Sequence, residues 1–261
     1  MTGKKTDNYD FSRLTKISPE LARHVRPNRH GNPSIDFADP AAVKALNRAI
    51  LLAECGLEWW DIPDGFLCPP VPGRALYIEE IARLLAASNG GTVPRGDSVG
   101  ILDIGTGANL IYPVIGRARY GWRFVGSELD AKAAASANRI IERNETLRGA
   151  VEVRRQYSPS SIFEGIIRPG EFFDAVICNP PFHSSAAEAR EGTRRKWEKL
   201  GKAAHGERLN FGGTQSELWC RGGEAAFAKR MIDESAAHAS QCGWFTVLIA
   251  KEEHFKTVKR A

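Results

Sequence analysis

The stretch "LDIGTGAN", residues 102–109, decides the fold. It ends the apolar run "SVGILDIG" (98–105), which predicts a buried strand that stops at a glycine-rich turn. In a doubly wound α/β sheet, such a turn lies at the carboxyl edge of the strands, where ligands bind. Gly105 and Gly107 allow the backbone to approach a ligand closely, because glycine adopts positive φ without a steric penalty. The structural alternative is a tight turn that binds nothing.

A second signal follows the next apolar run. "WRFVGSEL" (122–129) predicts a strand, and Glu128 lies at its end. An acidic residue at this place accepts hydrogen bonds from ribose hydroxyls, although alone it would more often be a charge at a helix entry. The dinucleotide pattern G-x-G-x-x-G needs a glycine where the chain has Leu110, which argues against NAD or FAD. The turn and the acid together predict an adenosine-type cofactor.

Strands and helices alternate through the rest of the chain. Continuous apolar strands between helices are typical of a parallel sheet covered on both faces, so we expect an α/β fold. The predicted strands are 98–105, 122–129, 151–156, 172–179 and 244–250, and the predicted helices are 108–120, 130–144 and 222–240.

A different pattern precedes this alternation. Residues 1–38 are polar, with a short helix predicted after Ser18-Pro19. Asp39-Pro40 is typical of an N-cap followed by proline at the first helical position, and the helix that follows ends at Gly56. The proline-rich stretch 59–74 predicts a loop, and a helix is predicted over 75–88. We therefore divide the chain into an N-terminal module with its loop (1–74) and a Rossmann-like domain (75–261).

Composition narrows the class of protein. The chain has 43% hydrophobic residues, and no apolar run approaches the roughly 20 residues that span a bilayer. The N-terminus has no apolar signal segment, and five scattered cysteines form no CxxC pair. These features predict a cytoplasmic protein with reduced thiols, no disulfide framework and no metal site. The net charge is +5, and basic stretches at 23–30 and 194–199 suit a phosphate-rich partner, although solvated surface is the alternative.

The third signal is "ICNPPFHSS" (177–185), which places Asn179 at the end of a predicted strand. The exocyclic amine of a nucleobase is a poor nucleophile, because its lone pair is delocalised into the ring. An amide oxygen and the carbonyl of Pro180 can accept its two N–H bonds, and proline fixes the backbone that presents them. Phe182 can stack on an extruded base. The structural alternative is a proline-rich turn.

These residues resemble the class I S-adenosylmethionine-dependent methyltransferases that carry an N-P-P-[FY] motif. Longer matches extend the resemblance to the RlmF family: "WWDIPDGFLCPPVPGR", "LDIGTGANLIYPVIG", "CNPPFHSSAAEA" and "ELWCRGGE". That family methylates N6 of an adenine in bacterial large-subunit (23S) ribosomal RNA, and its eukaryotic relatives act on small nuclear RNA and messenger RNA hairpins. The resemblance implies S-adenosyl-L-methionine as cofactor, ribosomal RNA or an assembling large-subunit particle as partner, a monomer, and no membrane or metal partner.

The resemblance also implies a role for each matching residue. Residues 1–38 would add phosphate contacts, and the segment from His183 to Gly213 would cover the site. The catalytic residues would be Asn179, Pro180 and Phe182; the cofactor-binding residues Arg74, Asp103, Gly105, Thr106, Gly107, Asn109, Glu128 and Ser161; and the substrate-binding residues Pro181, His183, Arg194, Arg195, Lys196 and Trp197.

Other functions remain open at this stage. A protein-glutamine methyltransferase could use the same acceptor pair, although that group usually carries N-P-P-Y. A catalytically silent relative would bind RNA without the cofactor, and a DNA adenine methyltransferase would need a duplex-reading module that we do not find. The family continues beyond the position of Ala261, so we expect the C-terminal strands of the sheet to be missing and segment 244–250 to present an open edge.

Overall fold

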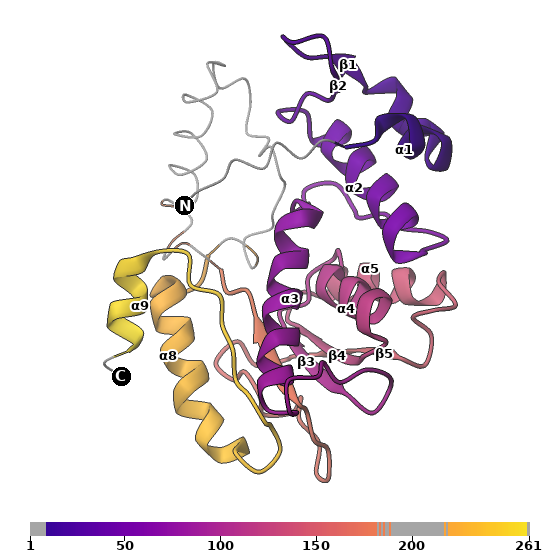
Figure 1. Ribbon diagram of the computed structural model, residues 1–261. Coiled ribbons are helices and arrows are strands. Elements are labelled where there is room, and N and C mark those ends of the chain that lie inside the picture. Colours follow the sequence, from indigo (N-terminus) through magenta and orange to yellow (C-terminus); the bar gives the residue numbers. More distant parts are fainter. Residues whose placement is uncertain are drawn as a thin grey trace.

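A four-stranded parallel sheet forms the centre of the molecule (Figure 1). The computed structural model describes residues 9–181, 183, 185, 188, 217 and 219–259. The strands lie in the order β5-β4-β3-β6, and every neighbouring pair is parallel, as the strand–helix alternation predicts. Their bounds are β3 (Gly100–Ile104), β4 (Arg123–Glu128), β5 (Val151–Arg155) and β6 (Ala175–Cys178).

The strand order reverses between β3 and β6. The chain places β4 and β5 on one side of β3 and then returns to place β6 on the other side. A crevice forms outside the carboxyl ends of the strands at such a point. Ile104 pairs with Ser127 of β4 and with Cys178 of β6. The glycine turn, Glu128 and Asn179 therefore leave the sheet at one edge.

Both faces of the sheet are covered, because successive strand residues point to opposite sides. Ile101 and Ile177 belong to the larger core, which the N-terminal elements share with α3, α4 and α5. Leu102 and Val176 belong to a second core with Phe163 and other residues from beyond β5. The helices are α3 (Val71–Ala87), α4 (Ile111–Tyr120), α5 (Ala131–Glu142), α8 (Gly223–Ser235), the short 3-10 helix η2 (Ala236–His238) and α9 (Glu252–Val258).

The N-terminal module confirms the start and stop signals in its sequence. Helix α2 (Pro40–Cys55) begins after Asp39, whose side chain accepts from the Ala41 N–H at 2.9 Å, and ends at Gly56 in the left-handed conformation. The predicted short helix is the 3-10 helix η1 (Pro19–Arg23). Before it lies α1 (Phe11–Ile17), and after it a hairpin of β1 (Arg26–Pro27) and β2 (Pro33–Ser34). Neither was predicted from the sequence.

Helix α3 begins earlier than predicted. The loop assigned to 59–74 ends at Pro70, and the helix includes Pro72, Gly73 and Arg74. Proline is compatible with the first helical turn, since the N–H that it lacks has no partner there. The prolines at the end of that stretch thus start a helix, and they place Arg74 on a rigid element.

The predicted fifth strand, 244–250, is extended but irregular. Phe245 forms an isolated bridge with Val176, and the N–H groups of Thr246 and Leu248 donate to β6 carbonyls at 2.8 and 2.9 Å. Segment 244–250 thus runs parallel to β6 without the continuous ladder that a strand requires. Within the part of the chain that the structure describes, no strand pairs with its other edge.

The structure bears on two expectations from composition, one about the cysteines and one about membrane-spanning helices. All five cysteines are free, as predicted. Within the same described ranges, no helix has the length and apolar character needed to cross a bilayer.

Candidate active site

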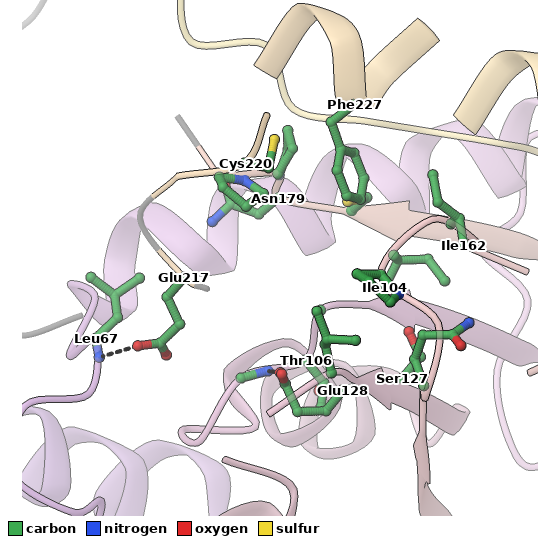
Figure 2. Close-up of a pocket in the computed structure, with 18 of the residues that line it drawn as sticks. Leu67, Ile104, Thr106, Ser127, Glu128, Ile162, Asn179, Glu217, Cys220 and Phe227 are labelled. Carbon is green, nitrogen blue, oxygen red and sulfur yellow. Dashed lines mark hydrogen bonds between the residues drawn. The ribbon is translucent and has the colours of Figure 1, made fainter. Parts of the chain in front are cut away.

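A cavity of about 370 Å³ opens at the carboxyl edge of the sheet, at the switch point between β3 and β6 (Figure 2). Its walls come from α3, from the ends of β3, β4, β5 and β6, from Glu217, and from residues 219–230. The close-up shows Asn179 and Cys220 on one side of the cavity and Thr106 and Glu128 on the other. Polar side chains therefore converge on a partly apolar space, as in small-molecule binding sites.

The glycine turn forms the floor of this cavity. Gly105 and Gly107 have φ of 73° and 70°, values that favour glycine. The N–H groups of Gly105 and Thr106 both donate to the Ser127 carbonyl at 3.0 Å, which fixes the turn against the end of β4. A Cβ on Gly126 would lie 2.8 Å from the Thr106 Cβ, so the close approach of β4 to the turn requires glycine there.

Two acidic side chains lie beneath the turn. Glu128 accepts the Gly107 N–H at 2.9 Å through Oε2 and the Asp130 N–H at 2.8 Å through Oε1. Burial raises its pKa, and these two backbone bonds oppose the shift. Asp103 is completely buried, and burial raises its pKa to about 7, although the neighbouring Thr106 side chain opposes the shift. Glu128 thus faces the cavity in a fixed orientation, whereas Asp103 lies behind its wall.

Asn109 has a structural role as well as a position in the cavity wall. Its Nδ2 donates to the Leu67 carbonyl at 3.1 Å, and its Oδ1 accepts the Ile111 N–H at 3.0 Å, where α4 begins. Leu110, between them, is fully buried with φ of 52°. The position that a dinucleotide motif would give to glycine is therefore a left-handed leucine, and the helix starts three residues later than predicted for 108–120.

Arg74 and Asn179 meet across the cavity. A guanidinium only donates, so the Asn179 amide must turn its oxygen toward Arg74. In that orientation, the oxygen lies 3.1 Å from Nη1 and 3.2 Å from Nη2 of Arg74. The same Nη1 lies 3.0 Å from the Tyr112 hydroxyl. The residue expected to bind a carboxylate thus contacts the residue expected to bind the target amine.

The backbone before Asn179 is held separately. Tyr77, one turn after Arg74 on α3, has its hydroxyl 3.4 Å from the Cys178 nitrogen and 2.8 Å from the Thr246 hydroxyl. Thr246 in turn donates to the Val176 carbonyl at 2.9 Å. These contacts tie the end of β6 to α3 and to segment 244–250, whatever the Asn179 side chain does.

The expected site residues divide into three groups. Two of them do not line the cavity. Asp103 is fully buried behind its wall, and His183 is half-buried, with its carbonyl accepting the Cys220 N–H at 3.1 Å. Phe182, Arg194, Arg195, Lys196 and Trp197 lie outside the described residues. The expected residues that line the cavity are Arg74, Gly105, Thr106, Gly107, Asn109, Glu128, Ser161, Asn179, Pro180 and Pro181.

Several wall residues were not predicted. Glu217 accepts the Leu67 N–H at 3.1 Å and places a second carboxylate near Glu128, where its charge contributes to the raised pKa of that group. Phe227 and Ile162 form an apolar part of the wall (Figure 2). No local motif marks these residues, since they come from distant segments that only the fold brings together. The "ELWCRGGE" match was the one available signal for Glu217.

The residues present fit an S-adenosyl cofactor. Glu128 offers buried acceptor lone pairs for a ribose, and Arg74 offers a fork of N–H donors for a carboxylate. A Cβ on Gly105 would meet nothing within 4 Å, so the turn leaves open space beside its backbone. Phe227, Ile104 and Ile162 supply apolar surface for an adenine ring. Across the described ranges, no cluster of three or more His, Cys, Asp or Glu could hold a metal ion.

The strand order and this site define a class I methyltransferase fold, and solved structures share it. The human Mettl16 catalytic domain in complex with MAT2A 3'UTR hairpin 1 superposes with a TM-score of 0.80 and 28% identity, covering 100% of this chain and 85% of that one. The N-terminal domain of human METTL16 in complex with SAH superposes with a TM-score of 0.74 and 26% identity, covering 100% and 87%.

The chain belongs to a family described as RNA methyltransferases, whose model matches residues 2–261. Proteins named "Ribosomal RNA large subunit methyltransferase F" are similar to it. The one from Serratia proteamaculans is 52% identical over 97% of this chain and 76% of its own length. The one from Cronobacter sakazakii is 54% identical over 97% and 81%. The expected resemblance is therefore confirmed, and the protein is an RNA methyltransferase.

Proposed function

We propose that this chain transfers a methyl group from S-adenosylmethionine to N6 of an adenine in large-subunit ribosomal RNA. The observation that carries the proposal is the position of Asn179 and Pro180 in the wall of the same cavity as Glu128 and the glycine turn. Relatives above 50% identity carry a large-subunit ribosomal RNA methyltransferase name, which supports that substrate. The SAH bound to the related human METTL16 domain supports the donor.

Four groups would hold the donor. Glu128 would accept from the ribose hydroxyls, and Arg74 would bind the carboxylate of the donor. The backbone of Gly105 and Gly107 would lie beside the part of the donor that joins its ribose to its carboxylate. Ser161, at the far wall, would approach the adenine ring. Once bound, S-adenosylmethionine supplies a methyl group on a positively charged sulfur. The protein contributes position and electrostatics, since it would orient both reactants.

Asn179 and Pro180 would bind the target amine. The amide oxygen of one and the backbone carbonyl of the other would accept the two N–H bonds of adenine N6. These bonds draw the nitrogen toward tetrahedral geometry and free its lone pair for attack. The surplus proton leaves after methylation, so no general base has to act beforehand. The buried Pro180 and the neighbouring Pro181 keep the carbonyl in a fixed direction.

The RNA would also contact the N-terminal module. Arg23, Arg26 and Arg29 are exposed around η1 and the β1–β2 hairpin, where they can reach phosphates. The division into residues 1–74 and 75–261 remains a proposal, as do action on 23S RNA, the monomeric state and the cytoplasmic location, which is where bacterial ribosomes assemble.

A tritium-methyl transfer assay tests the proposal. The purified chain is incubated with labelled S-adenosylmethionine and ribosomal RNA stripped of protein, and the RNA is digested to nucleosides. We expect label in N6-methyladenosine from the large-subunit RNA, and at least a hundredfold less with Asn179→Ala, because the amine then lacks its side-chain acceptor. Label in protein or in another nucleoside would contradict the proposal.

A further inference from the structure

Arg74 has two possible partners that need the same atoms. With its amide oxygen turned toward Arg74, as the donors of the guanidinium require, Asn179 places that oxygen within 3.2 Å of both terminal nitrogens. The oxygen, shared by Nη1 and Nη2, takes the two N–H bonds that lie side by side at the end of the guanidinium, and a carboxylate that binds end-on uses this same pair. One planar group with fixed donor directions cannot direct the same N–H at both partners.

The two partners differ in strength. Asn179 and Tyr112, which contact Arg74 here, are neutral acceptors. The bond to Asn179 joins the ionised guanidinium to a neutral oxygen. A carboxylate adds a full negative charge and a second parallel N–H···O bond, so it outcompetes an amide for a guanidinium. A ligand that brings a carboxylate to Arg74 therefore displaces the amide oxygen.

Only the side chain of Asn179 has to move for this exchange. The Tyr77 hydroxyl and the Thr246 side chain fix the end of β6 immediately before it. Rotation of a terminal amide is inexpensive, because that torsion has broad, shallow minima. The catalytic backbone can thus remain in place while the amide oxygen changes partner.

We propose that Arg74 is a positioning residue for Asn179: it holds the amide oxygen until a ligand carboxylate takes the guanidinium. The inference rests on the proposed function, since the donor supplies the carboxylate and the target adenine takes the released oxygen. Donor binding then prepares the acceptor for the target amine, so the donor-bound state receives the base better than the empty one.

The test measures what the carboxylate contributes to binding. Calorimetry gives the dissociation constants of S-adenosylhomocysteine and of S-adenosyl-3-thiopropylamine, which keeps the amine but lacks the carboxylate. The dissociation constant of the amine analogue divided by that of S-adenosylhomocysteine isolates the contribution of the carboxylate and cancels any contact between Asn179 and the amine. We expect Asn179→Ala to increase this ratio about three- to tenfold, the range of one net hydrogen bond, because Arg74 then has no competitor. Asn179→Asp should lower the ratio, since its carboxylate competes more strongly.

Two further variants make the result specific. With Arg74→Ala, the ratio should fall and become the same whether position 179 is Asn or Ala. Asn138→Ala, which changes a half-exposed asparagine on α5 outside the cavity wall, should leave the ratio unchanged. An unchanged or smaller ratio in Asn179→Ala, with normal wild-type binding, would overturn the inference alone. Failure of the folded wild type to bind S-adenosylhomocysteine would instead overturn the proposed function.

Discussion

Glu128 illustrates how one side chain can serve both the fold and a ligand. Its two oxygens accept the Gly107 and Asp130 N–H groups, yet each keeps a lone pair directed elsewhere. Glu128→Gln replaces one acceptor with a donor, so one backbone N–H loses its partner and a ribose loses an acceptor. We expect the affinity for S-adenosylhomocysteine to fall on the order of ten- to a hundredfold by calorimetry. Glu142→Gln, on the exposed side of α5, should leave it unchanged, and an equal loss in both variants would refute the assignment.

Asp103 should make the stability of the folded chain depend on pH. Burial raises the pKa of this carboxyl from 3.8 to about 7, so between these values the folded chain binds more protons than the unfolded chain. The contribution of Asp103 to stability therefore decreases as pH rises through this window and is constant above it. Asp103→Asn removes the titration. Urea unfolding across the window should show the variant gaining stability relative to wild type as pH rises, and a gain as pH falls would contradict the assigned shift.

At the scale of elements, α5 is joined to the segment that precedes α3. Asn144, fully buried just after α5, accepts the N–H groups of Glu58 and Trp59 at 2.7 and 3.1 Å and donates to the Trp59 and Ile140 carbonyls. Asn144→Ala removes the partner of four backbone groups, of which the Ile140 carbonyl is buried and the others lie in partly buried contacts. We expect a loss of about 2–3 kcal/mol in the free energy of unfolding, measured in urea. Asn138→Ala, on α5, is the control. A comparable small loss in both variants would show that the hydrogen bonds of Asn144 to residues 58 and 59 contribute little to stability.

Sequence patterns located elements where local signals agree. Asp39, Pro40 and Gly56 mark α2 because capping acts within a few residues. Pro70 and Pro72 misled the prediction, since the same residue type breaks a helix in its interior and begins one at its first turn. Segment 244–250 has strand composition, but a regular ladder depends on pairing that composition alone does not specify.

At the scale of the whole molecule, the site combines residues that the sequence could and could not reveal. Gly105, Glu128 and Asn179 were identifiable because each follows an apolar strand, and parallel strands end at one edge. The contact between Arg74 and Asn179 and the approach of Glu217 to Leu67 join distant segments and leave no periodic trace. Contacts of this kind depend on how α3, Glu217 and residues 219–230 pack around the sheet, which no local pattern encodes.

The N-terminal module supports a prediction about the whole molecule on RNA. Arg23, Arg26 and Arg29 are exposed on η1 and the β1–β2 hairpin, and none of them lines the cavity that would bind S-adenosylmethionine. Replacing all three by alanine should weaken binding to ribosomal RNA and flatten its salt dependence, by about 0.7–0.9 in the slope of log K against log salt for each phosphate that is no longer neutralised. Affinity for S-adenosylhomocysteine should not change, because the cavity walls are untouched.

A matched triple variant removes exposed cations around α5 and should keep the wild-type slope: Lys132→Ala, Arg139→Ala and Arg148→Ala. If both triple variants flattened the slope equally, only net charge would matter, and the N-terminal module would make no specific phosphate contacts.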